Sequence, residues 1–151
     1  MPVDVSTEIV IQRPRQEVSA YSAEPDNAPR WYSSIKQVKW ETPKPLAVGS
    51  RVAFAATFLG RTLAYTYEVI EFDPGRRLVM STKEGPFPME TTYSWEDAPD
   101  GATRMELRNR GSPSGFSSLA APFLSARMRK ANEQDLRTLK RILEGIQPPP
   151  V

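Results

Sequence analysis

Apolar and polar residues alternate along most of the first two thirds of the chain, and this period of two predicts β-strands. The first such segment spans residues 3–11, with Val3, Val5 and Ile11 on one face. Six further segments are separated by short turns rich in Gly, Pro and Asp, and they span 36–40, 51–59, 62–72, 77–83, 89–96 and 103–110. Turn signals at intervals of about 10–12 residues are typical of an antiparallel meander.

Helices are predicted on both sides of this meander. After the first strand, Pro14 marks the start of a short helix with Val18 and Tyr21 on one face. Asp26 is expected to cap a second short helix that carries Trp31 inward. Beyond residue 115 the period changes to 3.6, which predicts one long C-terminal helix. Its inward stripe is Leu124, Met128, Asn132, Leu136, Leu139, Leu143 and Ile146.

The expected order is therefore a strand, two short helices, six strands and a long helix. A seven-stranded antiparallel sheet with one apolar face needs a cover, and the C-terminal helix carries the only large apolar stripe left. We therefore expect an α+β fold in which a curved sheet wraps around this helix. The length of 151 residues suits one domain, expected over 1–147, with a short Pro-rich tail at 148–151.

Composition narrows the chemistry that is open to this chain. It contains neither His nor Cys, which excludes disulfides, thiolate nucleophiles, a Ser–His–Asp triad and metal sites built on Cys or His. There is no GxGxxG or GxxxxGK[ST] motif, and residues 97–101 lack the EF-hand spacing, so we expect no cofactor and no metal. The first residues do not form a secretion signal and no apolar run reaches about 18 residues, so a cytoplasmic protein without membrane insertion is expected.

Basic residues outnumber acidic ones in the C-terminal segment 122–147, which raises the alternative of a nucleic acid or an anionic membrane surface as partner. Several of these charges have an opposite charge four residues away, as Lys140 has in Glu144. A solvated helix face accounts for this pattern, so we expect no nucleic-acid partner.

Four segments of the chain resemble the SRPBCC or START-like superfamily, in particular its bacterial polyketide cyclase/dehydrase and lipid transport branch. They are Ile9–Val18, Pro25-Asp26-Asn27 with Trp31, Tyr67–Leu78 and Leu136–Lys140. These motifs are structural: a helix start, a tryptophan anchor and a β-turn. The resemblance covers essentially the whole chain and implies the helix-grip fold with a deep hydrophobic cavity. Members of the superfamily include carriers, receptors, co-chaperone domains and enzymes.

The inward strand faces and the C-terminal helix would line such a cavity. Three tyrosines, two threonines and Asn109 fall on these faces, where a filled core would favour Leu, Ile and Val. An apolar pocket with a few polar groups is the usual form of a small-molecule site, although cross-strand aromatic packing in a filled core remains an alternative. The candidate ligand-binding residues are Phe54, Phe58, Tyr65, Tyr67, Met80, Met89, Thr91, Tyr93, Trp95, Met105, Leu107, Asn109, Phe116, Leu124 and Met128.

Two positions carry additional expectations. Phe116 lies in a Gly- and Ser-rich loop, 111–119, which is either a gate over the cavity mouth or an ordinary connector. Glu71 shares the inward register with Tyr67, but it lies next to a turn where that register can slip, so an exposed rim charge is expected there. The other strand glutamates fall on the outward register, and no acid–base pair can be assigned.

The function expected from the sequence is the binding or carriage of a hydrophobic or amphipathic small molecule, whether lipid-like, polyketide-like or aromatic. A cofactor-independent cyclase or dehydratase that uses Tyr65, Tyr67 or Tyr93 is the first alternative. A protein-interaction module without a ligand is the second. The sequence leaves open whether the protein is a monomer or a homodimer.

Overall fold

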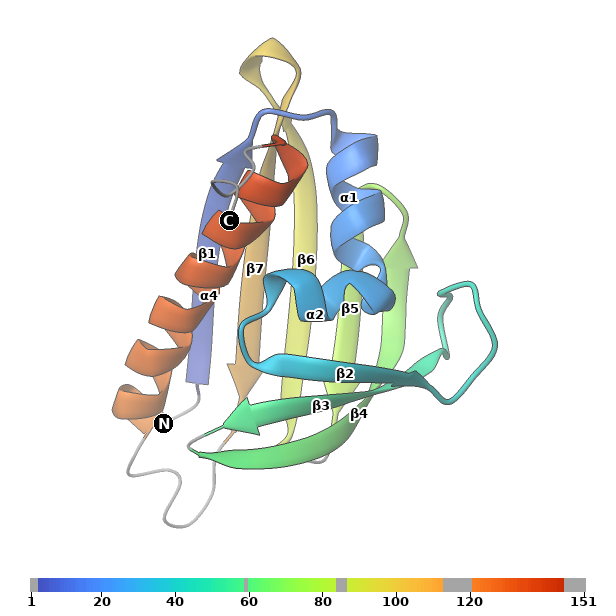
Figure 1. The fold of residues 1–151 in the computed structure, drawn as a ribbon, viewed down its shortest axis with the longest axis vertical. Helices are drawn as coiled ribbons and strands as arrows, with labels where there is room; N and C mark the ends of the chain where they lie inside the picture. The colour runs from blue at the N-terminus through green and yellow to red at the C-terminus, as the bar shows by residue number, and fades with distance from the viewer. Residues whose placement is uncertain (1–2, 59, 84–86, 113–120, 146–151) are drawn as a thin grey trace, which may run out of the picture.

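The computed structural model describes residues 3–58, 60–83, 87–112 and 121–145, with the exception of the Phe58 side chain (Figure 1). Within them, seven strands form one sheet: β1 (Val3–Ile11), β2 (Ile35–Trp40), β3 (Arg51–Phe58), β4 (Arg61–Asp73), β5 (Arg77–Thr82), β6 (Met89–Ala98) and β7 (Ala102–Gly111). The helices are α1 (Arg15–Ala23), α2 (Ala28–Trp31) and α4 (Ala121–Leu143), with short 3₁₀ turns η1 (Pro25–Asn27) and η2 (Pro99–Gly101). The expected order and the α+β class are confirmed. The ends of the predicted domain and tail lie outside the described residues.

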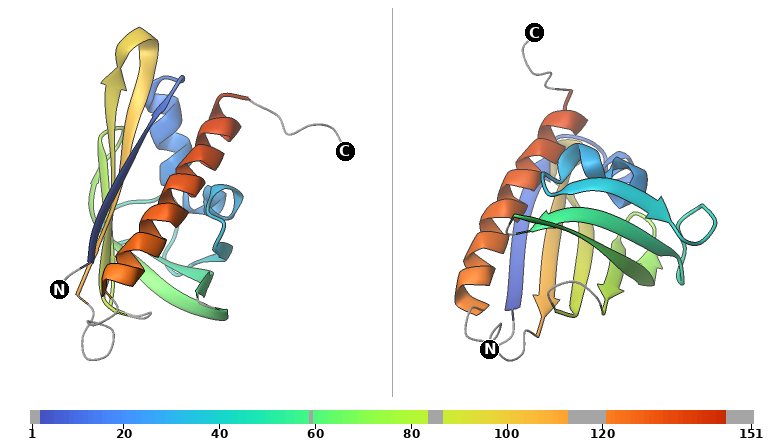
Figure 2. Two further views of the ribbon diagram at one scale, coloured as in Figure 1. Left: turned by 90° about the vertical axis from the view of Figure 1, so that its left-hand side faces the viewer. Right: turned by 60° about the horizontal axis from the view of Figure 1, so that its bottom comes forward.

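The strand order is β1-β7-β6-β5-β4-β3-β2, and every neighbouring pair is antiparallel. The first strand thus pairs with the last, with Val5 opposite Asn109, while the other strands follow one another as a meander. Figures 1 and 2 show that the sheet curves strongly and that α4 crosses its concave side, with α1 and α2 on that same side. This arrangement is the helix-grip fold that the sequence predicts.

Pro14 begins α1, as expected, because its fixed φ of −61° suits a helix start and its carbonyl accepts bonds from the next turn. The expected cap at Asp26 is wrong. The η1 turn runs directly into α2, whose capping residue is Asn27 and makes no side-chain capping bond to the helix. The Asp26 carboxylate instead accepts hydrogen bonds from Trp40 Nε1 at 2.9 Å and Lys44 Nζ at 2.6 Å.

Two buried tryptophans attach the short helices to the rest of the core. Trp31, at the end of α2, is 1% exposed, and its ring centroid lies 5.9 Å from that of Tyr93 on β6. Trp95, also on β6, donates from Nε1 to Ser22 Oγ of α1 at 3.0 Å. The Ser22 hydroxyl donates in turn to Val18 O at 2.6 Å. A continuous chain of hydrogen bonds therefore joins α1 to the sheet inside the core.

α4 covers the free edge of β1 as well as packing against the sheet. Leu136 and Leu139 are fully buried in the main core. Arg129 Nη1 donates to Ser6 O at 3.0 Å, and Lys140 Nζ donates to Val10 O at 2.7 Å. These bonds satisfy carbonyls that an edge strand otherwise leaves open. A solvated face therefore does not account for all of the basic residues, since some of them hold the helix to the sheet edge.

The register of β4 changes next to its turn. β4 and β5 shift against each other between Val69 and Glu71, so that Val69 is buried while Ile70 is 44% exposed. Glu71 is exposed and accepts a hydrogen bond from Arg77 Nε at 2.8 Å. The expectation of an exposed rim charge is confirmed, and the physical reason is this bulge.

None of the helices that the structure describes combines the length and the apolar character that crossing a bilayer requires.

We predict that Ser22→Ala destabilises the protein by about 2 kcal/mol, because it leaves the buried Trp95 Nε1 without an acceptor. In a domain of this size that corresponds to a fall in Tm of about 4–8 °C, measurable by differential scanning calorimetry. Ser19→Ala on the same helix is the matched control, since the Ser19 hydroxyl bonds to Gln16 O of its own helix. Equal Tm values for the two variants would contradict the anchoring role of Ser22.

Candidate functional site

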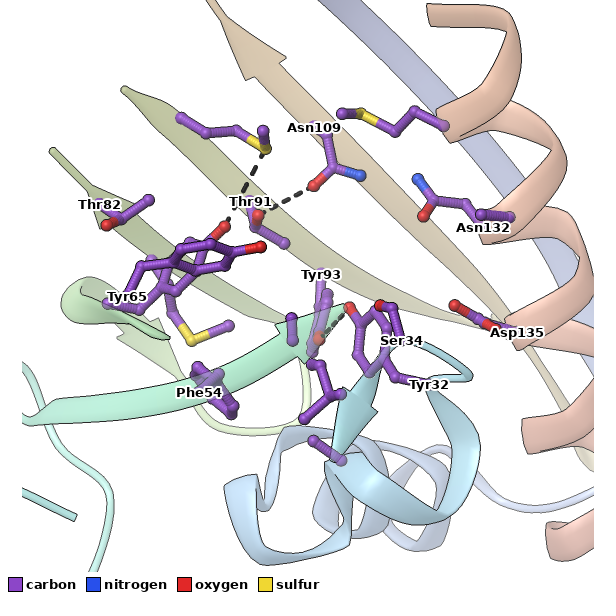
Figure 3. A pocket seen from close by; sticks show the side chains of 18 of the residues that line it. Tyr32, Ser34, Phe54, Tyr65, Thr82, Thr91, Tyr93, Asn109, Asn132 and Asp135 are labelled. Carbon is purple, nitrogen blue, oxygen red and sulfur yellow. Dashed lines mark hydrogen bonds between the residues drawn. The ribbon is translucent and has the colours of Figure 1, made fainter. Parts of the chain in front are cut away.

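A cavity of about 310 Å³ lies between the concave side of the sheet, α4 and the corner formed by α1, η1 and α2. Its lining comes from β3, β4, β5, β6 and β7 on one side and from α4 on the other. Figure 3 shows these side chains pointing into a shared space from opposite walls. The volume is at the lower end of the ~300–1,000 Å³ that is usual for small-molecule sites.

Most of the predicted lining residues lie at this cavity. Those that line it are Phe54, Tyr65, Tyr67, Met80, Met89, Thr91, Tyr93, Asn109, Leu124 and Met128. Their role in binding a ligand remains a prediction. Phe58 and Phe116 fall outside the side chains that the structure describes, as do residues 113–119 of the gate expected at 111–119.

Three predicted residues do not line the cavity. Trp95, Met105 and Leu107 are at most 2% exposed and belong to the main core. They have the inward register, but they lie where α1 and α4 pack directly onto β6, β7 and β1. The position along the strand, which alternation does not encode, decides whether an inward residue meets a helix or open space.

Several lining residues were missed because they come from the helices and the loop between α2 and β2. Tyr32, Ser34, Asn132 and Asp135 all line the cavity. The signal for Asn132 was available, since it occupies an apolar position of the helical stripe. Asp135 lies three residues after Asn132 on the same helix face. From the sequence alone it is counted among the charged residues of a solvated helix face.

Tyr32 and Tyr93 form a hydroxyl pair in the cavity wall. Their Oη atoms are 2.5 Å apart, and either can be the donor. Burial raises the pKa of Tyr93 well above its ordinary value. The pKa of Tyr32 is also raised, mainly by burial and to a lesser extent by the neighbouring Tyr93. Burial also raises the pKa of Tyr67 to about 12. All three phenols are therefore protonated at neutral pH and can donate hydrogen bonds.

Asp135 places a carboxyl group inside this wall. It is 3% exposed, and its Oδ1 accepts a hydrogen bond from the backbone N of Ser33 at 3.1 Å. Burial raises the pKa of Asp135, and the hydrogen bonds from Ser33 oppose the rise only in part. Of the described Lys and Arg side chains, none forms an ion pair with it.

Amide groups supply further polar atoms. Thr91 Oγ1 donates to Asn109 Oδ1 at 2.9 Å. On the facing helix, Asn132 is 5% exposed and its Nδ2 is buried without a hydrogen-bond partner. The cavity thus combines an apolar enclosure with phenols, amides, hydroxyls and the carboxyl groups of Asp135 and Glu24. Across the described residues there is no group of three or more acidic side chains that could hold a metal ion.

The fold is shared with solved structures from several bacteria. TTHA0849 from Thermus thermophilus is 17% identical with a TM-score of 0.79, over 96% of this chain and 99% of that one. A START superfamily protein from Mycobacterium smegmatis is 12% identical with a TM-score of 0.79, over 95% and 99%. The ZhuI aromatase/cyclase from a Streptomyces species is 15% identical with a TM-score of 0.78, over 95% and 94%. At these identities the likeness shows the fold alone.

No curated protein matches the chain. A family profile does, and it is described as polyketide cyclase/dehydrase and lipid transport and covers residues 2–144. Both the expected ligand carriage and the cyclase alternative fall within that description, so the function predicted from sequence is confirmed at the level of the family. The four motifs, the helix-grip fold and this match agree: the chain belongs to the polyketide cyclase/dehydrase and lipid transport family.

Proposed function

We propose that this protein binds a compact hydrophobic small molecule in the cavity between the sheet and α4. The observation that carries the proposal is the cavity itself, a space of about 310 Å³ inside a well-packed fold. The wall is mostly apolar and includes several aromatic and methionine side chains. Each Å² of apolar ligand surface buried against it contributes about 25 cal/mol. The modest volume favours a ligand of a few fused rings or a short chain.

The polar groups of the wall support a ligand over a merely imperfect core. In the main core, Trp95, Met105 and Leu107 have almost no exposure. The fold therefore packs large side chains closely in that region. At the cavity it instead places Asn132 and Asp135, whose burial costs free energy. A bound molecule with an acceptor oxygen for Asn132 and a hydroxyl donor for Asp135 would offset that cost.

The ten predicted residues that line the cavity, together with Tyr32 and Asn132, are the proposed ligand contacts. A cytoplasmic location, the absence of a nucleic-acid partner and a single domain over 1–147 remain predictions from sequence. The oligomeric state stays open.

We predict that freshly purified protein carries a noncovalent adduct in native mass spectrometry that disappears on denaturation. Ala56→Phe should abolish the adduct, because Ala56 is buried on β3 and lines the cavity, where a phenyl ring takes up the ligand's space.

The matched control is Ala55→Phe. It adds the same ring one residue earlier on the same strand, on the opposite face, and it should retain the adduct. The binding proposal would be contradicted by protein that carries no adduct and gains no Tm with any compact aromatic or acyl compound.

A second candidate function, catalysis of a proton transfer, is favoured by one specific observation. The buried carboxyl of Asp135 shares the cavity wall with the Tyr32–Tyr93 hydroxyl pair. Its raised pKa makes the carboxylate a stronger base than an exposed Asp. In a cyclase or dehydratase, Asp135 would accept a proton from carbon next to a ligand carbonyl while a tyrosine hydroxyl donates a hydrogen bond to the developing enolate oxygen. The interaction-module alternative has no comparable observation in its favour.

We predict that the wild-type protein accelerates hydrogen–deuterium exchange at the C1 position of 2-tetralone, followed by NMR in D₂O. Asp135→Asn should reduce the protein-dependent rate by about 100-fold or more, a typical loss for a general base. The rate should rise with pH as the carboxyl ionises, with a midpoint above the range usual for Asp because burial raises this pKa. Asp100→Asn, an exposed turn residue, is the control, and an equal effect of both variants would rule out the base.

We predict that Asp135→Asn, which lowers the exchange rate, increases the thermal stability of the protein at neutral pH. The pKa of Asp135 is higher in the folded than in the unfolded state, so its favourable contribution exists below the unfolded pKa and is lost as pH rises through the folded pKa. At neutral pH the ionised group is therefore a cost, and Asp135→Asn should raise Tm by about 2–4 °C at pH 7. The gain should shrink towards about pH 3 in calorimetric scans, where the carboxyl is protonated in both states. A lower Tm of the variant at pH 7 would contradict this account.

A further inference from the structure

Two amide side chains face each other across the cavity. Asn109 extends from β7 on the sheet wall and Asn132 from α4 on the opposite wall. In Figure 3 their amide nitrogens are turned toward one another. Neither amide belongs to the carboxyl and tyrosine group on which the proposed catalysis depends.

The orientation of Asn109 is set by its neighbour in the sheet. Thr91 lies opposite Asn109 in the β6–β7 pairing, and its Oγ1 donates to Asn109 Oδ1 at 2.9 Å. Both residues are buried. Since the carbonyl oxygen of the amide is engaged by the sheet, the Nδ2 end is the one presented to the cavity.

Unlike the amide oxygen of Asn109, the amide nitrogen of Asn132 has no hydrogen-bond partner within the described residues. The residue is 5% exposed, and its Nδ2 has no hydrogen-bond partner. An unpaired buried N–H group is costly in a folded protein. Leu or Met at this position would continue the apolar stripe of α4 without that cost, so the amide requires an explanation outside the protein's own contacts.

We propose that Asn109 and Asn132 together hold one acceptor oxygen, the carbonyl of a neutral and otherwise apolar ligand. This inference rests on the proposed binding function and names the ligand class. A carbonyl oxygen has two lone pairs, which suits two donors that approach from opposite walls. The rest of such a molecule would lie against the aromatic and methionine lining.

The charges around the cavity favour a neutral oxygen over a carboxylate. Glu24 and Asp135 line the cavity, and both are acidic. Among the described lining residues the cationic one is Arg127, whose guanidinium lies 5.6 Å from the ring centroid of Phe123, itself 57% exposed. That cation is at the outside of the protein, so a buried anion would have two amides but no positive charge beside it.

Three probes that share one tricyclic skeleton test the proposal: fluorene, 9-fluorenone and fluorene-9-carboxylate. The binding of each to the wild-type protein is measured by equilibrium dialysis. Fluorenone should bind about tenfold tighter than fluorene, a size of effect expected for two hydrogen bonds made on binding. The carboxylate should bind more weakly than fluorenone. Tighter binding of the carboxylate would overturn the inference in favour of an anion site.

Asn132→Leu identifies the groups responsible. It should reduce the preference for fluorenone from about tenfold to about threefold, because Asn109 keeps one of the two hydrogen bonds. Fluorene binding should stay within about twofold of wild type, because the apolar contacts are kept. Its Tm should be unchanged or higher, because the variant removes an unsatisfied donor. Gln134→Leu, exposed on the same helix, should keep the full preference for fluorenone. An undiminished tenfold preference in Asn132→Leu would overturn the assignment.

The outcomes separate this inference from the proposed function. Equal binding of fluorene and fluorenone to the wild type would leave the apolar binding site standing and overturn only the acceptor pair. Binding of none of the three probes, in protein shown by native mass spectrometry to be free of adduct, would count against the binding function and this inference together.

Discussion

One helix cannot cover the concave side of a seven-stranded sheet, and the rest of the structure follows from how this shortage is met. α4 packs against β1 and bonds to its free edge through Arg129 and Lys140. α1 and α2 cover a second area, where Trp95 and Ser22 join helix to sheet. Between these two contacts the sheet curves away (Figure 2), and the cavity remains. The cavity is thus a consequence of incomplete coverage rather than of a separate element.

The polar groups of the cavity acquire their properties from the same enclosure. Burial raises the pKa of the Tyr32, Tyr67 and Tyr93 phenols and of the Asp135 carboxyl. In water these groups would be ordinary hydrogen-bonding side chains. In a low-dielectric wall they become strong donors and a candidate base, and both roles are compatible with a family whose description joins lipid transport to cyclase and dehydrase chemistry. The fold alone does not choose between carriage and catalysis.

The differences between expectation and structure share a cause. Alternation identified the inward residues of β3 to β7 and therefore most of the strand lining. It could not separate Trp95 and Met105, which are covered by helices, from Thr91 and Asn109, which reach the cavity. It also missed Tyr32, which lies in a loop without periodicity, and Asp135, which has the sequence pattern of an exposed charge on a helix. Distinguishing them requires the distance between sheet and helix, which no local pattern records.

The sequence by itself determined the order of elements, the α+β class and the family, since strand and helix periods, turn residues and the Tyr67–Leu78 motif are local properties of the chain. It also excluded Cys- and His-based chemistry by composition. Only the tertiary structure decided that Asn132 faces Asn109, that Asp135 is buried beside two tyrosines and that the α4 cations hold the β1 edge. These contacts join residues far apart in sequence, and their geometry depends on the curvature of the sheet and the path of α4 across it.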